Sequence, residues 1–299
     1  MPTHSTQSLD VAAHVAASIV PAVLDVLGQR WSLAIIQALQ QQETSFGQLL
    51  AALGIPRSTL AARLKHLQSM GCLEPAAHGY RLSAAGRALL PVVSLAQAWS
   101  GNNRVIYRHA CGRDFVPVLR CAHCLEPIRA RDISLEGPGE PPDLKLPKPL
   151  RRSRAEFSLP ASFGAAEILG DRWTALIIAL GFFGVQRYSD LARHLAIAPN
   201  ILAARLQRLC EEQVLRRDGP RYHFSERGLQ LFPLIVALTE WGDNWLRPPG
   251  QRPTRMVHLP CGHTLSPQLC CGGCGQPAGL ESLDPTGMGV PATEFQAGS

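Results

Sequence analysis

The sequence lacks a long apolar run. Its longest one, from Trp173 to Val185, has 13 residues, whereas a membrane-spanning helix needs about 18 or more. The first residues also lack a basic stretch leading into an apolar segment, the pattern of a secretory signal peptide. Motifs of common catalytic sites are missing too: there is no nucleophile elbow, P-loop, dinucleotide-binding fingerprint or H-E-x-x-H pair. We therefore expect a cytoplasmic protein that is not an enzyme.

Lysine is scarce, although the chain is basic. Lys65, Lys145 and Lys148 are the only lysines, so arginine carries almost all of the positive charge behind the formal net charge of +6. The planar guanidinium group suits phosphate and the edge of guanine. A hydrophobic share of 46% and a charged share of 17% are typical of a globular protein. This modest basic excess is compatible with a nucleic-acid partner but does not by itself indicate one.

What the sequence does contain is an internal duplication. Gly28 matches Gly170, an offset of 142 residues, and the same offset pairs Trp31 with Trp173. The pentapeptide LAARL occurs at 60–64 and again at 202–206. The same ungapped register also pairs Phe46 with Tyr188, Tyr80 with Tyr222, Ser83 with Ser225, Gly86 with Gly228 and Trp99 with Trp241. An ungapped match of this length indicates two copies of one domain.

The first copy has the order of elements found in a winged helix-turn-helix. Ser45 is expected to cap a short helix that ends at Gly54, and Pro56 is expected to begin a second helix. In that helix Leu60, Leu64 and Leu67 recur at helical spacing and predict its buried face. Two short strands around a turn near His78–Gly79 would form the wing.

The second copy repeats this order. Ser189 is the expected cap, the second helix is expected from Asn200 to Leu209, and the wing should turn at Asp218–Gly219–Pro220. Trp99 and Trp241 lie on the last helix of each copy and are expected at the interface between modules. The predicted fold class is mainly α with small β wings.

These motifs resemble the HxlR-type winged helix-turn-helix regulators of bacteria. The opening L-D-x-x-G-x-(K/R)-W-x-x-x-I is matched by Leu24–Ile36 and, more loosely, by Ala166–Ile178. L-x-x-R-L is matched in both LAARL segments, and Y-x-L-S-x-x-G by Tyr80–Gly86 and, with Phe224 in place of the leucine, by Tyr222–Gly228. The resemblance implies a DNA-binding regulator of transcription that normally acts as a homodimer. Two fused copies could form a pseudo-dimer within one chain and read two unequal half-sites about 34–36 Å apart.

The residues expected to contact double-stranded DNA lie on the second helix and on the wing of each copy. They are Arg57, Ser58, Thr59, Arg63, His66 and Arg81 in the first copy, and Asn200, Arg205, Arg208 and Arg221 in the second. Phosphate contacts are the more common kind for such arginines, and ion pairing on the helix surface is the alternative. Ser58, Thr59 and Asn200 could equally be helix N-caps.

Each module is followed by a run of cysteines with preserved spacing. Cys111-x9-Cys121-x2-Cys124 matches Cys261-x9-Cys271-x2-Cys274 at an offset of 150 residues. Three thiolates and one histidine would complete a tetrahedral zinc site in each knuckle. We favour His109 for the first knuckle and His258 for the second, while His123, His263 and Cys270 are alternatives. Redox-active C-x-x-C pairs or simple buried thiols are the other interpretations.

The predicted domain organisation follows from these signals. It comprises a winged helix-turn-helix at 9–105, a Cys-rich knuckle at 106–133, a Pro- and Gly-rich linker at 134–158, a second winged helix-turn-helix at 159–249, a second knuckle at 250–283 and a tail at 284–299. A zinc-stabilised protein–protein adaptor is the alternative function. Whether the fused chain pairs again as a homo-oligomer stays open.

Overall fold

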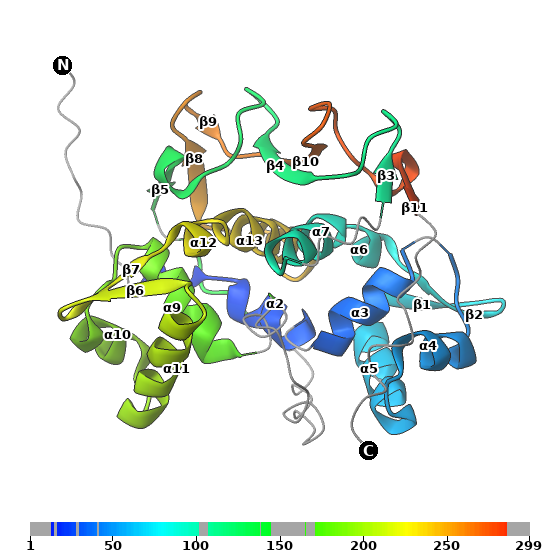
Figure 1. The fold of residues 1–299 in the computed structure, drawn as a ribbon, viewed down its shortest axis with the longest axis horizontal. Coiled ribbons are helices and arrows are strands. Elements are labelled where there is room, and N and C mark those ends of the chain that lie inside the picture. Colours follow the sequence, from blue (N-terminus) through cyan, green and yellow to red (C-terminus); the bar gives the residue numbers. More distant parts are fainter. Residues whose placement is uncertain are drawn as a thin grey trace.

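The structure is a computed structural model that describes residues 13–14, 17–27, 30–40, 42–101, 107–137, 139–144, 165 and 171–285. Two helical modules lie side by side, and a layer of short strands covers one face of both (Figure 1). The first module contains α2 (Val20–Leu27), α3 (Arg30–Ala38), α4 (Phe46–Leu53), α5 (Arg57–Ser69), β1 (Leu73–Ala76), β2 (Gly79–Leu82), α6 (Ala84–Arg87) and α7 (Leu90–Trp99). The second contains α9 (Arg172–Phe182), α10 (Tyr188–Leu195), α11 (Pro199–Glu211), β6 (Leu215–Asp218), β7 (Arg221–Phe224), α12 (Glu226–Leu229) and α13 (Phe232–Trp245). Among the described helices, none has the length and apolar character needed to cross a membrane.

The helix-turn-helix of the first module is set by local signals. Ser45 Oγ accepts from the backbone N–H of Gln48, and the Ser45 N–H donates to Gln48 Oε1 at 2.8 Å, which together form a capping box. Gly54 ends α4 at a φ of 59°, a left-handed conformation that glycine adopts without strain. Leu60, Leu64 and Leu67 are buried, so the predicted inner face of α5 is confirmed.

The second module has the same order with different end signals. α10 begins after Arg187 without a side-chain cap, so the prediction that Ser189 caps this helix is wrong. α10 ends at Ala196, which adopts the left-handed conformation that Gly54 adopts at the end of α4. β6 and β7 form a hairpin that closes at Gly219–Pro220, and the predicted wing turn is confirmed.

The two modules share one hydrophobic core and contact each other reciprocally. α13 packs against both α2 and α7. Trp99 Nε1 donates to the carbonyl of Arg227 at 2.9 Å, and Trp241 Nε1 donates to the carbonyl of Ala85 at 2.9 Å. In the 142-residue register Trp99 corresponds to Trp241 and Ala85 to Arg227, so each contact is the counterpart of the other. The prediction that both tryptophans lie between the modules is confirmed.

The segments after the two modules form one joint layer, which we call the cap. It contains β3 (Tyr107–His109), β4 (Pro117–Cys121), β5 (Ile133–Glu136), β8 (Arg255–His258), β9 (His263–Thr264), β10 (Pro267–Cys271) and β11 (Leu283–Pro285). β4 pairs antiparallel with β10, β3 with β11, and β5 with β8. Each of these pairs joins strands from different halves, and the expectation of two separate knuckles is therefore wrong.

Part of the predicted linker is ordered against the second half. Ser134 to Glu136 belong to β5, and Glu140 forms an ion pair with Arg252 at 2.9 Å. Residues 145–158 of the predicted linker, and the tail after 285, lie outside the described residues.

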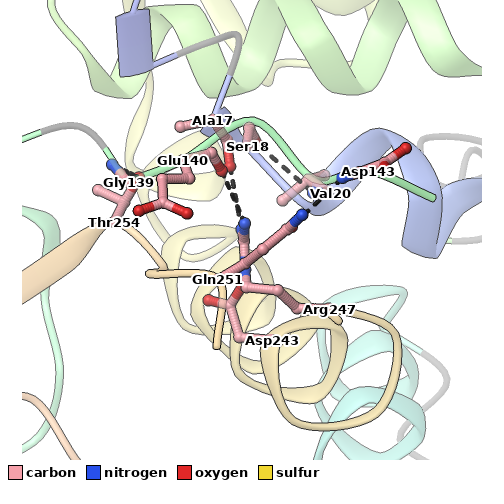
Figure 2. Close-up of polar contacts among 10 residues, drawn as sticks. All are labelled: Ala17, Ser18, Val20, Gly139, Glu140, Asp143, Asp243, Arg247, Gln251 and Thr254. Atoms are coloured by element: carbon pink, nitrogen blue, oxygen red, sulfur yellow. Dashed lines mark hydrogen bonds and ion pairs between the residues drawn. The ribbon is translucent and has the colours of Figure 1, made fainter. Parts of the chain in front are cut away.

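Arg247 connects three segments at this point (Figure 2). Its side chain is only 3% exposed and forms an ion pair with Asp243 at 2.6 Å. The remaining nitrogens donate to the carbonyls of Glu140 at 2.8 Å and Ala17 at 3.0 Å. Burial raises the pKa of the Asp243 carboxyl, although Arg247 opposes this shift. The end of α13, the start of the linker and the approach to α2 are thus held by one buried guanidinium group.

Candidate nucleic-acid interface and metal-binding clusters

The second helices of the two helix-turn-helix units, α5 and α11, lie on the same face of the molecule. Figure 1 shows them at opposite ends of the face that points away from the cap, with the hairpins β1–β2 and β6–β7 to their outer sides. Arg57 and Ser58 at the start of α5 are exposed and Thr59 is half-buried, and Ala61 and Ala62 follow on the outer side. Small exposed residues let a helix approach the walls of a DNA groove closely.

Two of the residues predicted to contact DNA are instead buried in the first module. Arg63 is 4% exposed and His66 is 6% exposed. His66 Nε2 donates to the carbonyl of Asp25 at 3.0 Å, and burial lowers the pKa of its imidazole. The reason is helical geometry: positions 63 and 66 lie within one turn of the buried Leu60, Leu64 and Leu67. The prediction that Arg63 and His66 face DNA is wrong.

In the second module, α11 presents a different surface. Asn200, Ile201 and Arg208 are exposed. Arg205, predicted to contact DNA, is half-buried and forms an ion pair with Asp171, which also accepts from the N–H of Trp173 at the start of α9. The charge of Arg205 therefore joins two helices of the protein, which agrees with the ion-paired alternative, and its contact with DNA stays a prediction.

The capping alternative for the helix starts is also settled. α5 begins after Pro56 and α11 after Ala198, and neither start has a side-chain cap. Ser58, Thr59 and Asn200 lie inside the first turns of these helices, where Ser58 and Asn200 are exposed and Thr59 is half-buried.

The wings carry unequal charge. Arg81 on β2 is exposed and paired with Glu74 on β1 at 2.8 Å. On the second wing Arg216, Arg217 and Arg221 are all exposed. Arg216 and Arg217 were not among the predicted DNA contacts. The run R-R-D-G-P-R, which places arginines on both sides of the predicted turn, is the sequence signal for this basic wing surface.

Cysteine and histidine side chains of the cap gather in two clusters. Cluster A consists of His109, Cys111, Cys271 and Cys274, and cluster B of Cys121, Cys124, His258 and Cys261. These are the eight residues expected as metal ligands, but each cluster takes two from each half. The predicted grouping, with three cysteines of one knuckle around one ion, is wrong. The extended β4 separates Cys111 from Cys121, and its antiparallel partner β10 brings Cys271 to the opposite end.

The geometry of both clusters suits a tetrahedral ion. Within each cluster the four ligand atoms lie within 4.8 Å of one another. In cluster B, His258 Nδ1 lies 3.3 Å from Cys124 Sγ and 3.5 Å from Cys261 Sγ, and the sulfurs of Cys121 and Cys261 are 3.9 Å apart. In cluster A, His109 Nδ1 lies 3.5 Å from Cys274 Sγ. A tetrahedral zinc ion would separate two sulfurs by about 3.8 Å and a sulfur from a nitrogen by about 3.6 Å.

The surroundings of the first cysteine in each C-x-x-C pair favour a thiolate. Burial alone would raise the pKa of the Cys121 thiol, but backbone N–H groups of His123 and Cys124 and the neighbouring thiols outweigh it, so this pKa lies below its ordinary value. Cys271 has the matching environment, with the N–H groups of Gly273 and Cys274, and its pKa is lowered in the same way. Thiolates are the form of cysteine that binds metal.

The other ligand candidates lie outside both clusters. His123 and His263 stack on each other with ring centroids 4.5 Å apart, and Cys270 is buried beside Cys271. All nine cysteines are free thiols. Each C-x-x-C pair begins at the last residue of a β-strand and continues into a turn, whereas thiol–disulfide enzymes place this motif at the start of a helix.

Comparison with known proteins agrees with the duplication. The family model described as HxlR-like helix-turn-helix matches residues 26–106 and again 168–249, together more than half of the chain. An uncharacterised HTH-type transcriptional regulator of Mycobacterium bovis is 37% identical over 128 residues, which cover 40% of this chain and 81% of that protein. An uncharacterised HTH-type transcriptional regulator of Bacillus subtilis is 30% identical over 92 residues, 28% of this chain and 85% of that protein. The crystal structure of PA1607 is 31% identical and covers 44% of this chain and 96% of its own, with a TM-score of 0.36.

Proposed function

Because this chain belongs to the HxlR-like helix-turn-helix family, we propose that it is a cytoplasmic transcriptional regulator whose two modules bind duplex DNA together, as an intrachain pseudo-dimer. In this proposal α5 and α11 each enter a major groove on the same side of the duplex, about one helical turn apart. The protein would read an imperfect inverted repeat. Regulation is by binding, and the proposal assigns no enzymatic activity.

The observation that carries the proposal is the reciprocal pairing of the modules. The two tryptophan-to-carbonyl hydrogen bonds, Trp99 to Arg227 and Trp241 to Ala85, are related by the 142-residue register. Such reciprocity is the mark of an isologous, two-fold interface, in which residue i contacts j and j contacts i. A two-fold arrangement of reading helices matches a two-fold DNA site.

The two half-sites should differ because the exposed residues at the helix starts differ. Arg57 and Ser58 of α5 correspond to Pro199 and Asn200 of α11. Arginine forms paired hydrogen bonds with guanine, whereas asparagine pairs with adenine. Ile201, which is 36% exposed, offers an apolar contact for the methyl group of thymine. We therefore propose a guanine-containing half-site under α5 and an A·T-rich one under α11.

We propose that most contacts to DNA phosphates come from the second module. Arg208 on α11 and Arg221 on the wing are exposed, and the neighbouring Arg216 and Arg217 add to this basic surface. Arg81 would contribute in the first half if it leaves Glu74. Phosphate contacts fix the register of a protein on DNA and make its affinity depend on salt.

The test is selection of binding sequences with the full chain, followed by footprinting. Arg57→Ala should lower affinity by about 1–3 kcal/mol and relax the preference at one half-site. Arg221→Ala should weaken binding to all DNA sequences alike and should reduce the slope of log K against log salt concentration by about 1. Arg129→Ala, an exposed arginine of the cap, is the matched control and should change neither. Two identical half-sites would overturn the proposed asymmetry, and salt-insensitive binding would overturn the assignment of phosphate contacts.

We also propose that clusters A and B each bind a structural zinc ion. Three thiolates and one imidazole are a ligand set that zinc prefers. Support comes from the mutual distances of the ligand atoms and from the pairing of two ligands from each half in both clusters. Metal analysis of purified protein should find two zinc ions per chain, and thiol titration should detect six additional reactive cysteines after chelation.

A second candidate function is favoured by one observation. The cap exposes Val116, Leu125 and Leu259 to between 53% and 56%, and apolar side chains on a surface remote from DNA could bind a protein. A zinc-stabilised adaptor would bind duplex DNA weakly or with little dependence on salt, so the salt titration separates the two functions.

A further inference from the structure

Clusters A and B are connected through one pair of strands. β4 ends at Cys121 of cluster B, and β10 ends at Cys271 of cluster A. In the antiparallel register Cys121 lies opposite Pro267, and Cys271 lies opposite Pro117. The two cysteines therefore mark opposite ends of one two-stranded sheet, about 13 Å apart along the strands at about 3.3 Å per residue.

The histidine ligands lie on strands that also pair with the other half of the chain. His109 on β3 pairs with Leu283 on β11, and His258 on β8 pairs with Ile133 on β5. One backbone hydrogen bond also lies beyond each end of the β4–β10 pair. The N–H of Ala122 donates to Ser266 O at 2.8 Å, and the N–H of Gly272 donates to Val116 O at 2.7 Å. In the 150-residue register these two bonds are counterparts. Ordering the ligands of either cluster therefore orders strands that carry ligands of the other.

The cap packs on the helical modules and shares their core. Leu119, Ile128 and Leu265 belong to the core of the modules, and Tyr107, Leu269 and Leu283 form a smaller cluster with Leu90 of α7. Cys121 is part of the shared core, and Cys124 and Cys261 pack against it. Because the cysteines are free thiols, a metal ion is the cross-link that these side chains could provide between the two halves of the cap.

We infer that the cap is a cooperative two-metal unit, in which a zinc ion bound in one cluster raises the affinity of the other cluster for the second ion. The inference rests on the proposed zinc ligation and adds the coupling between the two sites. Binding of the first ion must also order β4 against β10, and this ordering lowers the net affinity for that ion, as in other domains where metal binding drives folding. The second ion then finds its ligands already in place, so its binding needs less ordering.

The experiment is a titration of the metal-free full chain with Zn²⁺ against a competing chelator. The wild type should bind two ions per chain, with a steeper curve than two independent sites would give. Cys124→Ser removes a ligand from cluster B and Cys274→Ser one from cluster A. Each variant should bind the remaining ion at least about 10-fold more weakly than the wild type, within the usual range of coupling between sites.

Two controls make the result specific. Cys270→Ala changes a buried thiol next to Cys271 that belongs to neither cluster, so it should keep two ions and the wild-type curve. Circular dichroism should show that the helices of both ligand variants remain folded. Coupling is reciprocal, and the loss of affinity caused by Cys124→Ser and by Cys274→Ser at the opposite cluster should therefore be of similar size.

The possible outcomes separate this inference from the proposed function. Independent binding of two ions, with the remaining cluster unaffected in each variant, overturns the coupling and leaves both the zinc ligation and the DNA-binding proposal intact. Failure to bind any zinc overturns the ligation together with the coupling. Cooperative binding by a chain that does not recognise DNA supports the coupling and overturns the regulator.

Discussion

Individual residues in this protein often have roles that their type alone does not indicate. Arginine dominates the basic charge, yet Arg63, Arg205 and Arg247 are used inside the protein. Arg63 is buried in the first module, Arg205 pairs with Asp171, and Arg247 pairs with Asp243 beneath the linker. A count of arginines therefore overstates the charge that DNA could meet.

Arg247→Ala should be among the more destabilising single substitutions in the chain. It would leave the carboxylate of Asp243, whose side chain is only 16% exposed, without its partner, and breaking a buried ion pair costs about 3–5 kcal/mol. Arg252→Ala is the matched control, because its ion pair with Glu140 is exposed and such pairs contribute about 0–1 kcal/mol. Urea unfolding of both variants checks this, and equal midpoints would contradict it.

His66 should make the stability of the first module depend on pH. Burial lowers the pKa of its imidazole in the folded state below the ordinary value of 6.5. When the pH falls below 6.5, His66 becomes protonated in the unfolded chain while it stays neutral in the folded chain. The free energy of unfolding therefore decreases. This loss grows until the pH reaches the lowered pKa of the folded state.

His66→Gln tests this, because glutamine can also donate to the carbonyl of Asp25 but does not titrate. The slope of unfolding free energy against pH between 6.5 and lower values should be smaller in the variant than in the wild type. An unchanged slope would mean that other groups cause the pH dependence.

At the scale of elements, one close approach joins the modules. A Cβ atom on Gly242 of α13 would lie 2.5 Å from Val23 Cγ2 and 2.8 Å from Ile19 on the side of α2. The glycine lets the two helices pack closely enough for α13 to contact both α2 and α7.

Gly242→Val should therefore separate the modules and disturb the relative placement of α5 and α11. Affinity for a duplex with two half-sites should decrease by at least about 10-fold, because the advantage of linked binding depends on geometry that permits both contacts. Affinity for a duplex with one half-site should change less. Asn244→Val, on the exposed side of the same helix, is the control. If Gly242→Val and Asn244→Val changed the affinity for each duplex by the same factor, this account would be contradicted.

Elements also show how far the sequence could lead. The periodicity of Leu60, Leu64 and Leu67 predicted the buried face of α5, and the Gly219–Pro220 turn predicted the second wing. The same periodicity implied that Arg63 is buried, but arginine was assigned to the surface by residue type. The grouping of the metal ligands could not be predicted, because cysteine spacing within each copy contains no information on which strands pair between copies.

For the molecule as a whole, the helical modules and the cap should respond differently to a metal chelator. The modules supply most of the shared apolar core, whereas the cap adds only Leu119, Cys121, Ile128 and Leu265 to it, and a small second cluster joins the cap to Leu90 of α7. Chelation should therefore lower the midpoint of thermal unfolding while most of the helical circular dichroism signal at 25 °C is kept. Loss of the helical signal on chelation would show that the modules themselves require metal.

The covalent joining of the two copies has a consequence for how such a regulator behaves in a cell. A homodimer assembled from separate chains dissociates as its concentration decreases, whereas two modules on one chain stay together at any abundance. Under the proposed mode of binding, the fused protein would occupy its site when only a few copies are present. If the two modules pair within the chain as proposed, each has its partner already attached, and the two different reading surfaces stay together on one molecule.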